Sequence, residues 1–195
     1  MNIDFLIAGA EKSGTSSLAY YLREHKDIFI PDIKETWYFL DENFHKGDDW
    51  YNKFFDGRRS DQRIGEATPF YMYFEKVPKR IHAFSPDTKL IFILRNPIDR
   101  AYSKYWHALT GGFEDQDFET ALSLEENRLK TSYRFQQLYS YTDAGMYYKQ
   151  IKIYLDYFNK DQMFFALFEK FKAQTQETLN DIYDFLEIKP IENKR

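Results

Sequence analysis

The 195-residue sequence contains no cysteine, which excludes disulfide bonds, thiolate zinc sites and cysteine nucleophiles. Glycine and proline are scarce, with 8 and 6 residues, which excludes a collagen-like or linker-dominated chain. No apolar run reaches the roughly 20 residues that a membrane-spanning helix needs, and no basic leader precedes Phe5. We therefore expect a cytoplasmic protein without a transmembrane segment.

The chain also lacks an excess of positive charge. Its formal net charge is −4, which does not favour binding to a polyanionic nucleic acid, so any anionic ligand must be held by a local site. Hydrophobic residues make up 43% of the sequence and aromatic residues 19%, enough for one large core. We expect a single domain over residues 1–195, and the sequence does not indicate an oligomeric state.

Short apolar segments alternate with helical patterns along the chain. Buried strands are expected at residues 3–8, 27–31, 89–95 and 163–168, with a further extended segment at 64–73 that Pro69 interrupts. Helices are expected at residues 15–26, 47–55, 75–84, 97–109, 118–129, 147–158 and 179–186. Residues 131–141 show no clear period and are expected to form a loop. This alternation predicts an α/β fold with a central, mainly parallel sheet flanked by helices.

A glycine-containing loop, residues 9–17, lies between the first strand and the first helix. Glycines let the backbone turn tightly, and the free N–H groups at a helix start bind anions. Lys12 adds a mobile positive charge to this loop, and Thr15, Ser16 and Ser17 add hydroxyl donors. An ordinary helix N-cap is the alternative interpretation, but the preceding strand and the internal lysine favour an anion site.

The loop resembles the P-loop of nucleoside triphosphatases only in part. Gly9 and Gly14 have the P-loop spacing, but Thr15 stands where the P-loop lysine would follow the second glycine. Arg95 ends the strand at 89–95, where many such enzymes carry a metal-binding aspartate. A cation there repels magnesium and attracts phosphate, which predicts a phosphorylated nucleotide handled without metal. A P-loop kinase or NTPase remains the alternative.

Arg95 begins a second candidate anion site. Ligands of open parallel sheets bind at the carboxyl ends of the strands, where Arg95 is expected. Its guanidinium offers a bidentate fork, and Ser103, about two helical turns later, offers a hydroxyl to the same phosphate. Arg100 and Lys104 lie on the same predicted helix, and we expect them either on a solvated face or in pairs with neighbours.

Together these segments resemble the PAPS-dependent sulfotransferase family, most closely its branch of heparan sulfate sulfotransferases and bacterial relatives. Residues 12–18 are similar to the family's loop for the 5′-phosphosulfate of PAPS (3′-phosphoadenosine 5′-phosphosulfate), and residues 95–105 to its 3′-phosphate site. Residues 34–39 and 65–71 are similar to two motifs between them. The resemblance implies a P-loop-like sulfotransferase fold. It also implies transfer of a sulfuryl group from PAPS to a hydroxyl or amine, with PAP (adenosine 3′,5′-bisphosphate) as product and no metal.

The resemblance also implies roles for individual residues. Lys12 contacts the leaving phosphate, and Glu35 is the general base that accepts the acceptor's proton. Arg95 and Ser103 bind the 3′-phosphate of the cofactor. The 5′-phosphate is bound by a run of loop residues: Lys12, Ser13, Gly14, Thr15, Ser16 and Ser17. Other bases left open by the sequence are His25, His45, His82, His107 and Glu66.

Two departures from the family pattern bear on the acceptor and on activity. Ala67 stands where the heparan enzymes usually carry a lysine, which argues against a heparan-like polyanion. The basic, glycine-containing loop that closes over the cofactor in the family is not recognisable before Arg195, so a non-catalytic PAP-binding module is a further alternative. The acceptor is expected to be a small molecule or a carbohydrate. Aromatic residues that could stack on sugar rings are Trp37, Tyr38, Trp50, Tyr71, Trp106 and Tyr139.

Overall fold

The computed structural model describes residues 1–192 and contains a five-stranded parallel sheet with the order β2-β3-β1-β4-β5. The strands are β1 (Phe5–Gly9), β2 (Ile28–Phe29), β3 (Arg63–Ala67), β4 (Lys89–Leu94) and β5 (Met163–Leu167). The predicted α/β class with a central parallel sheet is confirmed. The predicted end of the domain at residue 195 lies outside the described residues.

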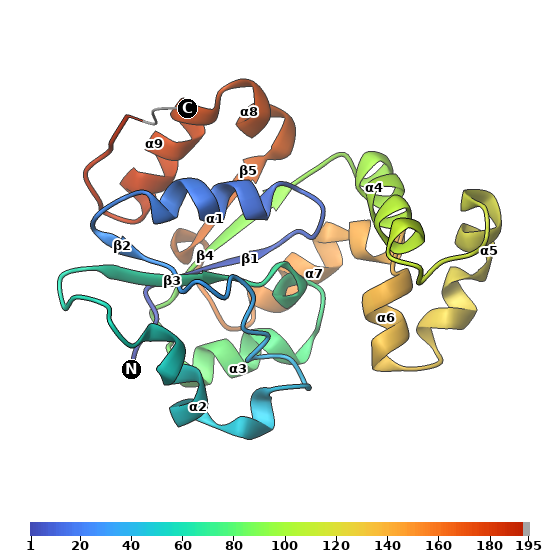
Figure 1. The fold of residues 1–195 in the computed structure, drawn as a ribbon, viewed down its shortest axis with the longest axis horizontal. Coiled ribbons are helices and arrows are strands. Elements are labelled where there is room, and N and C mark those ends of the chain that lie inside the picture. Colours follow the sequence, from blue (N-terminus) through green and yellow to red (C-terminus); the bar gives the residue numbers. More distant parts are fainter. Residues whose placement is uncertain (193–195) are drawn as a thin grey trace.

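Helices cover both faces of the sheet, and α4, α5 and α6 form a lobe beside it (Figure 1). The helices are α1 (Thr15–Arg23), α2 (Asp48–Asn52), α3 (Lys76–Phe84), α4 (Pro97–Thr110), α5 (Phe118–Leu129), α6 (Tyr133–Tyr139), α7 (Tyr147–Tyr154), α8 (Phe168–Ala173) and α9 (Thr175–Phe185). Short 3₁₀ turns are η1 (Phe44–Lys46), η2 (Lys53–Phe55), η3 (Pro69–Met72), η4 (Asp143–Gly145) and η5 (Lys160–Gln162). None of the helices within residues 1–192 is long and apolar enough to span a membrane.

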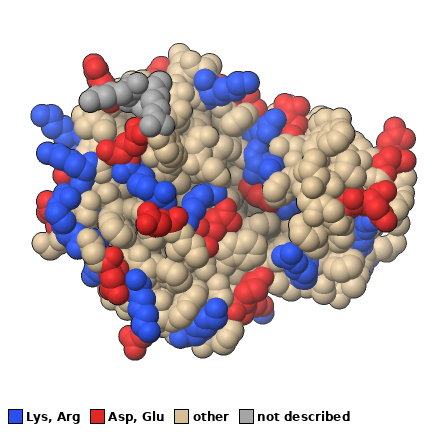
Figure 2. Space-filling view, in the orientation of Figure 1, with Lys and Arg blue, Asp and Glu red and all other residues tan. Residues whose placement is uncertain are grey.

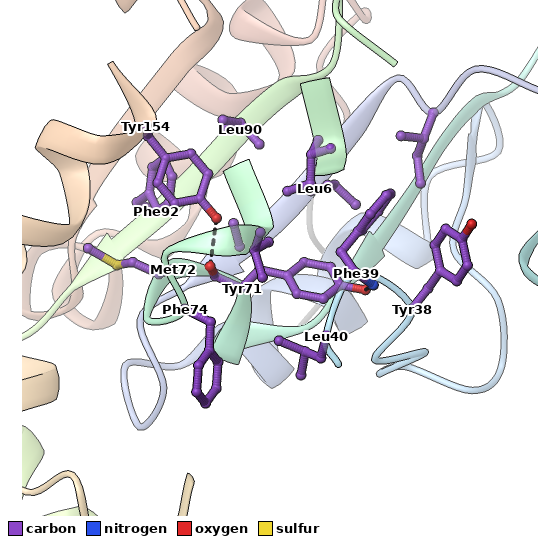
Figure 3. Packing of buried hydrophobic residues seen from close by; sticks show 14 of the residues in the cluster. Leu6, Tyr38, Phe39, Leu40, Tyr71, Met72, Phe74, Leu90, Phe92 and Tyr154 are labelled. Carbon is purple, nitrogen blue, oxygen red and sulfur yellow. Dashed lines mark hydrogen bonds between the residues drawn. The ribbon is translucent and has the colours of Figure 1, made fainter. Parts of the chain in front are cut away.

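The core is divided between the two faces of the sheet because successive side chains of a strand point to opposite sides. On one face, Leu6, Leu90 and Phe92 of the strands meet Tyr71 of η3 and Tyr154 of α7 (Figure 3). On the other face, the strands pack against α1, α8 and α9. Burial on both faces explains why β1 and β4 are continuous apolar runs rather than alternating ones.

The structure corrects one prediction in the lobe. Residues 131–141 are not a loop, because α6 occupies Tyr133–Tyr139. The Ser132 side chain caps this helix by accepting from the Phe135 N–H at 3.2 Å. The one residue of α6 that is buried is Gln137, a polar residue, so the helix leaves no apolar period in the sequence.

The carboxyl ends of β1, β3 and β4 lie side by side because the three strands are parallel neighbours. The loop after β1, the turn η3 after β3 and the start of α4 after β4 therefore meet at one edge of the sheet. Asn96 starts α4 by accepting from the Ile98 N–H at 2.9 Å, and Pro97 occupies the first helical position. This edge is where ligands of open parallel sheets bind.

Candidate functional site

The loop after β1 has the backbone of an anion-binding turn. Lys12 and Gly14 both adopt left-handed conformations, with φ of 64° and 84°. Gly14 is also the N-cap of α1, so the first-turn N–H groups of that helix point out of the loop. A Cβ at Gly14 would lie 3.0 Å from the Phe168 ring, so both the conformation and the space there require glycine. The loop combines open N–H donors, a helix dipole and a lysine.

Arg95 lies directly beside this loop. Its Nη1 donates to the main-chain oxygen of Lys12 at 3.1 Å, and its guanidinium lies 4.8 Å from the centre of the Phe168 ring. Its Nε is buried and has no partner among the described residues, so a donor remains free for a ligand. The two segments that the sequence marks as anion sites therefore meet in space.

A cavity of about 580 Å³ opens between these segments and the lobe. That volume is in the usual range for small-molecule sites. Figure 2 shows the surface hollowed between the main body and the lobe, with charged side chains at the rim. The predicted site residues that line the cavity are Lys12, Gly14, Thr15, Ser16, Ser17, Glu35 and Arg95.

Two predicted cofactor ligands lie outside that lining. Ser13 is fully buried beneath the loop, so it can offer a ligand its main chain but not its side chain. Ser103 is half-buried on α4, on the same helix as the lining residues Lys104 and His107. Their roles in cofactor binding stay predictions.

Glu35 lies in the cavity wall and is held by two donors. Lys34 Nζ lies 2.6 Å from Glu35 Oε1, and the Trp37 indole N–H donates to Oε2 at 3.1 Å. Lys34 also donates to Ser16 Oγ at 2.8 Å, which ties the carboxylate to the start of α1. A carboxylate therefore stands beside the anion-binding loop with a fixed orientation.

Lys104 and Arg100 do not lie on a solvated helix face, because α6 and the chain after it cover α4. Lys104 is 3% exposed and contacts both carboxylate oxygens of Glu11 at 2.7 Å, while also donating to the main-chain oxygen of Gln137. Arg100 is fully buried and donates to the main-chain oxygen of Tyr141. Burial lowers the pKa of Lys104, whereas the Glu11 carboxylate opposes that change.

Of the sequence's four histidines, all within the described residues, His107 is the one that lines the cavity. Burial lowers the pKa of His107, and the nearby charge of Lys12 lowers it further, so the ring is neutral at pH 7. His25 is buried elsewhere, with its Nε2 2.9 Å from the main-chain oxygen of Lys189. Glu66 is fully buried and is not part of the cavity wall.

Sequence reasoning missed several residues of the cavity wall. Trp37 was singled out for its aromatic ring, but Tyr38 and Tyr71, which were singled out with it, belong to the core. Pro69 and Phe70 of the wall belong to the 65–71 motif, whereas five further wall residues come from elements far apart in the chain and carry no common motif: Phe113, Arg134, Gln137, Leu138 and Phe168. The packing of the lobe and of α8 beside the loop after β1 brings these residues to the cavity.

The fold and this site define an α/β protein with an anion-binding loop and a facing arginine at one edge of the sheet. The sequence profile of the sulfotransferase domain matches residues 2–194, so the chain belongs to the sulfotransferase domain family, whose members are PAPS-dependent transferases. The family suggested by the sequence motifs is therefore confirmed.

Individual relatives agree with this assignment. A sulfotransferase from Alicyclobacillus acidocaldarius is 35% identical, with a TM-score of 0.90 over 98% of this chain and 83% of that chain. Mouse heparan sulfate glucosamine 3-O-sulfotransferase 3B1 is 31% identical over 95% of this chain and 46% of its own length. The chain thus spans about half the length of the curated relatives that it matches. A mouse sulfotransferase solved with PAP shares the fold, at 22% identity and a TM-score of 0.60 over 98% of this chain and 60% of its own.

Proposed function

We propose that this protein transfers a sulfuryl group from PAPS to a hydroxyl or amine acceptor, with PAP as the product. The observation that carries this proposal is the meeting of the Lys12 loop and Arg95 at one cavity, joined by a 3.1 Å hydrogen bond. A nucleotide with phosphates at two positions needs two separate groups of donors, and the cavity has both. Family membership supports the choice of PAPS over other nucleotides.

The residues present suit such a nucleotide. The open N–H groups from Ser13 to Ser16 and the Lys12 ammonium would hold the 5′-phosphate end. Arg95, with its free Nε, and Ser103 would hold the 3′-phosphate. When bound, PAPS supplies an activated sulfuryl group and a phosphate leaving group. Lys12 would stabilise the charge that develops on that leaving phosphate.

Glu35 would accept the proton that the acceptor loses. A carboxylate serves as a general base when it lies within hydrogen-bond reach of the proton it takes. Glu35 is in the cavity wall next to the loop, and its two donors, Lys34 and Trp37, fix its direction. His107 lies in the same wall and is neutral at pH 7, so it is the second candidate for this role.

We propose a carbohydrate or a small alcohol or amine as the acceptor. Aromatic rings of Trp37, Phe70 and Phe113 line the cavity and could stack on a sugar or an aromatic alcohol. Ala67 is fully buried and adds no charge to the cavity, which weakens the case for a heparan-like polyanion. The curated relatives named for heparan sulfate therefore support a carbohydrate but not that particular one.

Calorimetric titration tests the nucleotide half of the proposal. PAP should bind without magnesium, and more tightly than ATP with magnesium. Tighter ATP binding with no heat from PAP would favour a P-loop kinase or NTPase instead.

Turnover tests the chemical half. Lys12→Ala should abolish sulfuryl transfer from PAPS and leave the fold intact, whereas Lys152→Ala, on the exposed side of α7, should change neither. Full turnover by Lys12→Ala would remove Lys12 from its role. PAP binding by the wild-type protein without transfer to any of a broad acceptor panel would identify a non-catalytic PAP-binding module.

A further inference from the structure

Residues at the end of β3 form hydrogen bonds with the main chain on both sides of Glu35. The Ala67 N–H donates to the Lys34 main-chain oxygen at 3.3 Å, and the Thr36 N–H donates to Glu66 Oε2 at 3.3 Å. The two peptide groups that flank Glu35 are therefore each held by one of two consecutive residues, Glu66 and Ala67. The first contact is between main-chain atoms and is open to any residue, but the second depends on the Glu66 side chain.

The segment that Glu66 holds has an unfavourable backbone. Trp37 adopts a left-handed conformation with φ of 56°, which a bulky residue rarely takes unless its surroundings enforce it. This conformation brings the indole N–H to Glu35 Oε2 at 3.1 Å and the ring to Phe70, with 5.2 Å between ring centres. The direction of the Glu35 carboxylate thus depends on a turn that needs support from outside.

We propose that Glu66 is a positioning residue for Glu35: its buried carboxyl holds the Thr36 N–H and so maintains the turn that aims Glu35 into the cavity. The inference rests on the proposed function, in which Glu35 accepts the acceptor's proton. Glu66 itself does not reach the cavity, so it acts through the chain from 35 to 37 and not on the acceptor.

Glu66 is fully buried among mainly aromatic side chains. Its side chain enters the aromatic core that Tyr51, Tyr71 and Phe39 form, and Figure 3 shows Tyr71 and Phe39 side by side there. Its Oε1 has no hydrogen-bond partner among the described residues. Burial raises the pKa of Glu66 to about 7, although polar contacts with Thr36, Tyr71 and Tyr51 oppose that rise. A carboxyl in such a place destabilises the fold, and its polar contacts are the Thr36 N–H and the hydroxyl groups of Thr36, Tyr51 and Tyr71.

Two substitutions separate the hydrogen bond with the Thr36 N–H from the ionisable charge of Glu66. Glu66→Gln keeps an amide oxygen that can accept from the Thr36 N–H and removes the ionisable group. Glu66→Leu keeps a similar volume in the core but removes the acceptor. A fold that needs Glu66 only for packing should tolerate leucine better than glutamine, whereas positioning of Glu35 requires the opposite order.

The first readout does not depend on turnover. The indole N–H of Trp37 gives its own nuclear magnetic resonance signal, assigned by its loss in Trp37→Phe. This signal should keep its position in Glu66→Gln. In Glu66→Leu it should move and exchange faster with solvent, because the turn that holds the indole on Glu35 has lost its support. An unchanged Trp37 signal in Glu66→Leu would overturn the proposal.

The second readout is transfer from PAPS to 4-nitrophenol. Glu66→Leu should lower kcat on the order of 100-fold, because small misplacements of a reacting group have effects of that size. The affinity for PAP should stay unchanged, because the 12–17 loop and Arg95 are not touched, and Glu66→Gln should retain most of the wild-type kcat. Equal kcat values for Glu66→Leu and the wild type would also overturn the proposal.

Glu125→Leu is the matched control. Glu125 is a buried glutamate of α5 whose carboxylate accepts from the main-chain N–H groups of Thr142 and Asp143 at 2.9 Å, far from Glu35 in the chain. Its loss should destabilise the fold without moving the Trp37 signal. A wild-type protein that binds no PAP and turns over no PAPS would refute the proposed function, while the Trp37 signal would still decide whether Glu66 maintains the turn.

Discussion

Arg95 Nη1 donates to the main-chain oxygen of Lys12 at 3.1 Å, although the two residues are 83 positions apart in the chain. The contact joins the end of β4 to the loop after β1, which is the strand next to it in the sheet. It orients the guanidinium towards the start of α1 and leaves Nε free. The two segments that the sequence predicts as anion sites thus line one cavity.

Replacing Arg95 by lysine should weaken PAP binding by about 10- to 100-fold. The ammonium keeps the charge but loses the planar fork and the stacking on Phe168, and a charge-assisted hydrogen bond contributes about 1.5–3 kcal/mol. Calorimetric titration measures the affinity, and thermal unfolding checks that the fold is kept. Unchanged PAP affinity in Arg95→Lys would show that Arg95 does not contact the nucleotide through its fork.

The buried pair of Glu11 and Lys104 predicts an asymmetric effect on stability. The two side chains are 15% and 4% exposed and lie 2.7 Å apart. Glu11→Gln should lower the free energy of unfolding by about 2–4 kcal/mol, because it leaves the Lys104 ammonium buried without a counter-charge. Combining Glu11→Leu with Lys104→Met should recover much of that loss. Urea unfolding of the single and double variants measures both effects, and an unchanged midpoint in Glu11→Gln would contradict the expectation.

The raised pKa of Glu66 predicts that the fold becomes less stable as the pH rises from about 5 to about 7. Its pKa is about 7 in the folded chain against an ordinary value of 4.5, so the folded state binds more protons in this window. The loss is roughly 3 kcal/mol at about 1.4 kcal/mol for each pKa unit, and it is complete above the folded-state pKa. Tyr51 and Tyr71 stay neutral here, because burial raises their pKa values well above 10.0.

The measurement compares Glu66→Gln with the wild type by urea unfolding at pH 5 and pH 8. All other groups titrate alike in the two proteins, so their difference isolates Glu66. Relative to the wild type, the variant should gain stability between the two pH values. Parallel stability profiles would mean that Glu66 ionises normally in the folded chain.

The lowered pKa of Glu114 predicts that the lobe becomes less stable as the pH falls into the acid range. Burial opposes its ionisation, but hydrogen bonds from Arg128 and Tyr141, at 3.1 and 2.7 Å, prevail and lower its pKa to about 2. Because its pKa is depressed in the folded chain, the stability that it contributes is present above about pH 4.5 and is lost as the pH falls towards 2, roughly 3 kcal/mol in all.

Hydrogen exchange of the α5 backbone between pH 5 and pH 2.5 checks this expectation. The protection factors of the α5 amides, which compare their exchange rates with those of the unfolded chain at the same pH, should fall on acidification more in the wild type than in Glu114→Gln. Glu126→Gln is the control, because Glu126 is an exposed residue of the same helix paired with Lys130. A response to acid that is the same in Glu114→Gln and in the wild type would contradict the lowered pKa.

The spacing of apolar residues in the sequence predicted those helices and strands that present an apolar face to a core. The helix expected at 118–129 is α5 with those bounds, and the strand expected at 89–95 is β4. Both present apolar side chains to a core, which imposes a regular spacing on the sequence. The helix α6 escaped detection because its one buried residue is the polar Gln137, which contacts Lys104 and Glu42, while its Tyr133 stacks on Phe74. Such contacts involve partners far away in the chain and leave no local pattern.

The amino-acid sequence alone determined the strand-loop-helix unit around Lys12, the arginine at the end of a buried strand and the family to which the chain belongs. These properties are local, because strand burial, glycine conformation and helix starts depend on neighbouring residues. Only the tertiary structure decided that Arg95 contacts Lys12, that Lys104 pairs with Glu11 inside the protein and that Glu66 holds the turn beside Glu35. Each of these contacts joins residues that the order of parallel strands and the packing of the lobe bring together, and that order is not a property of any single segment.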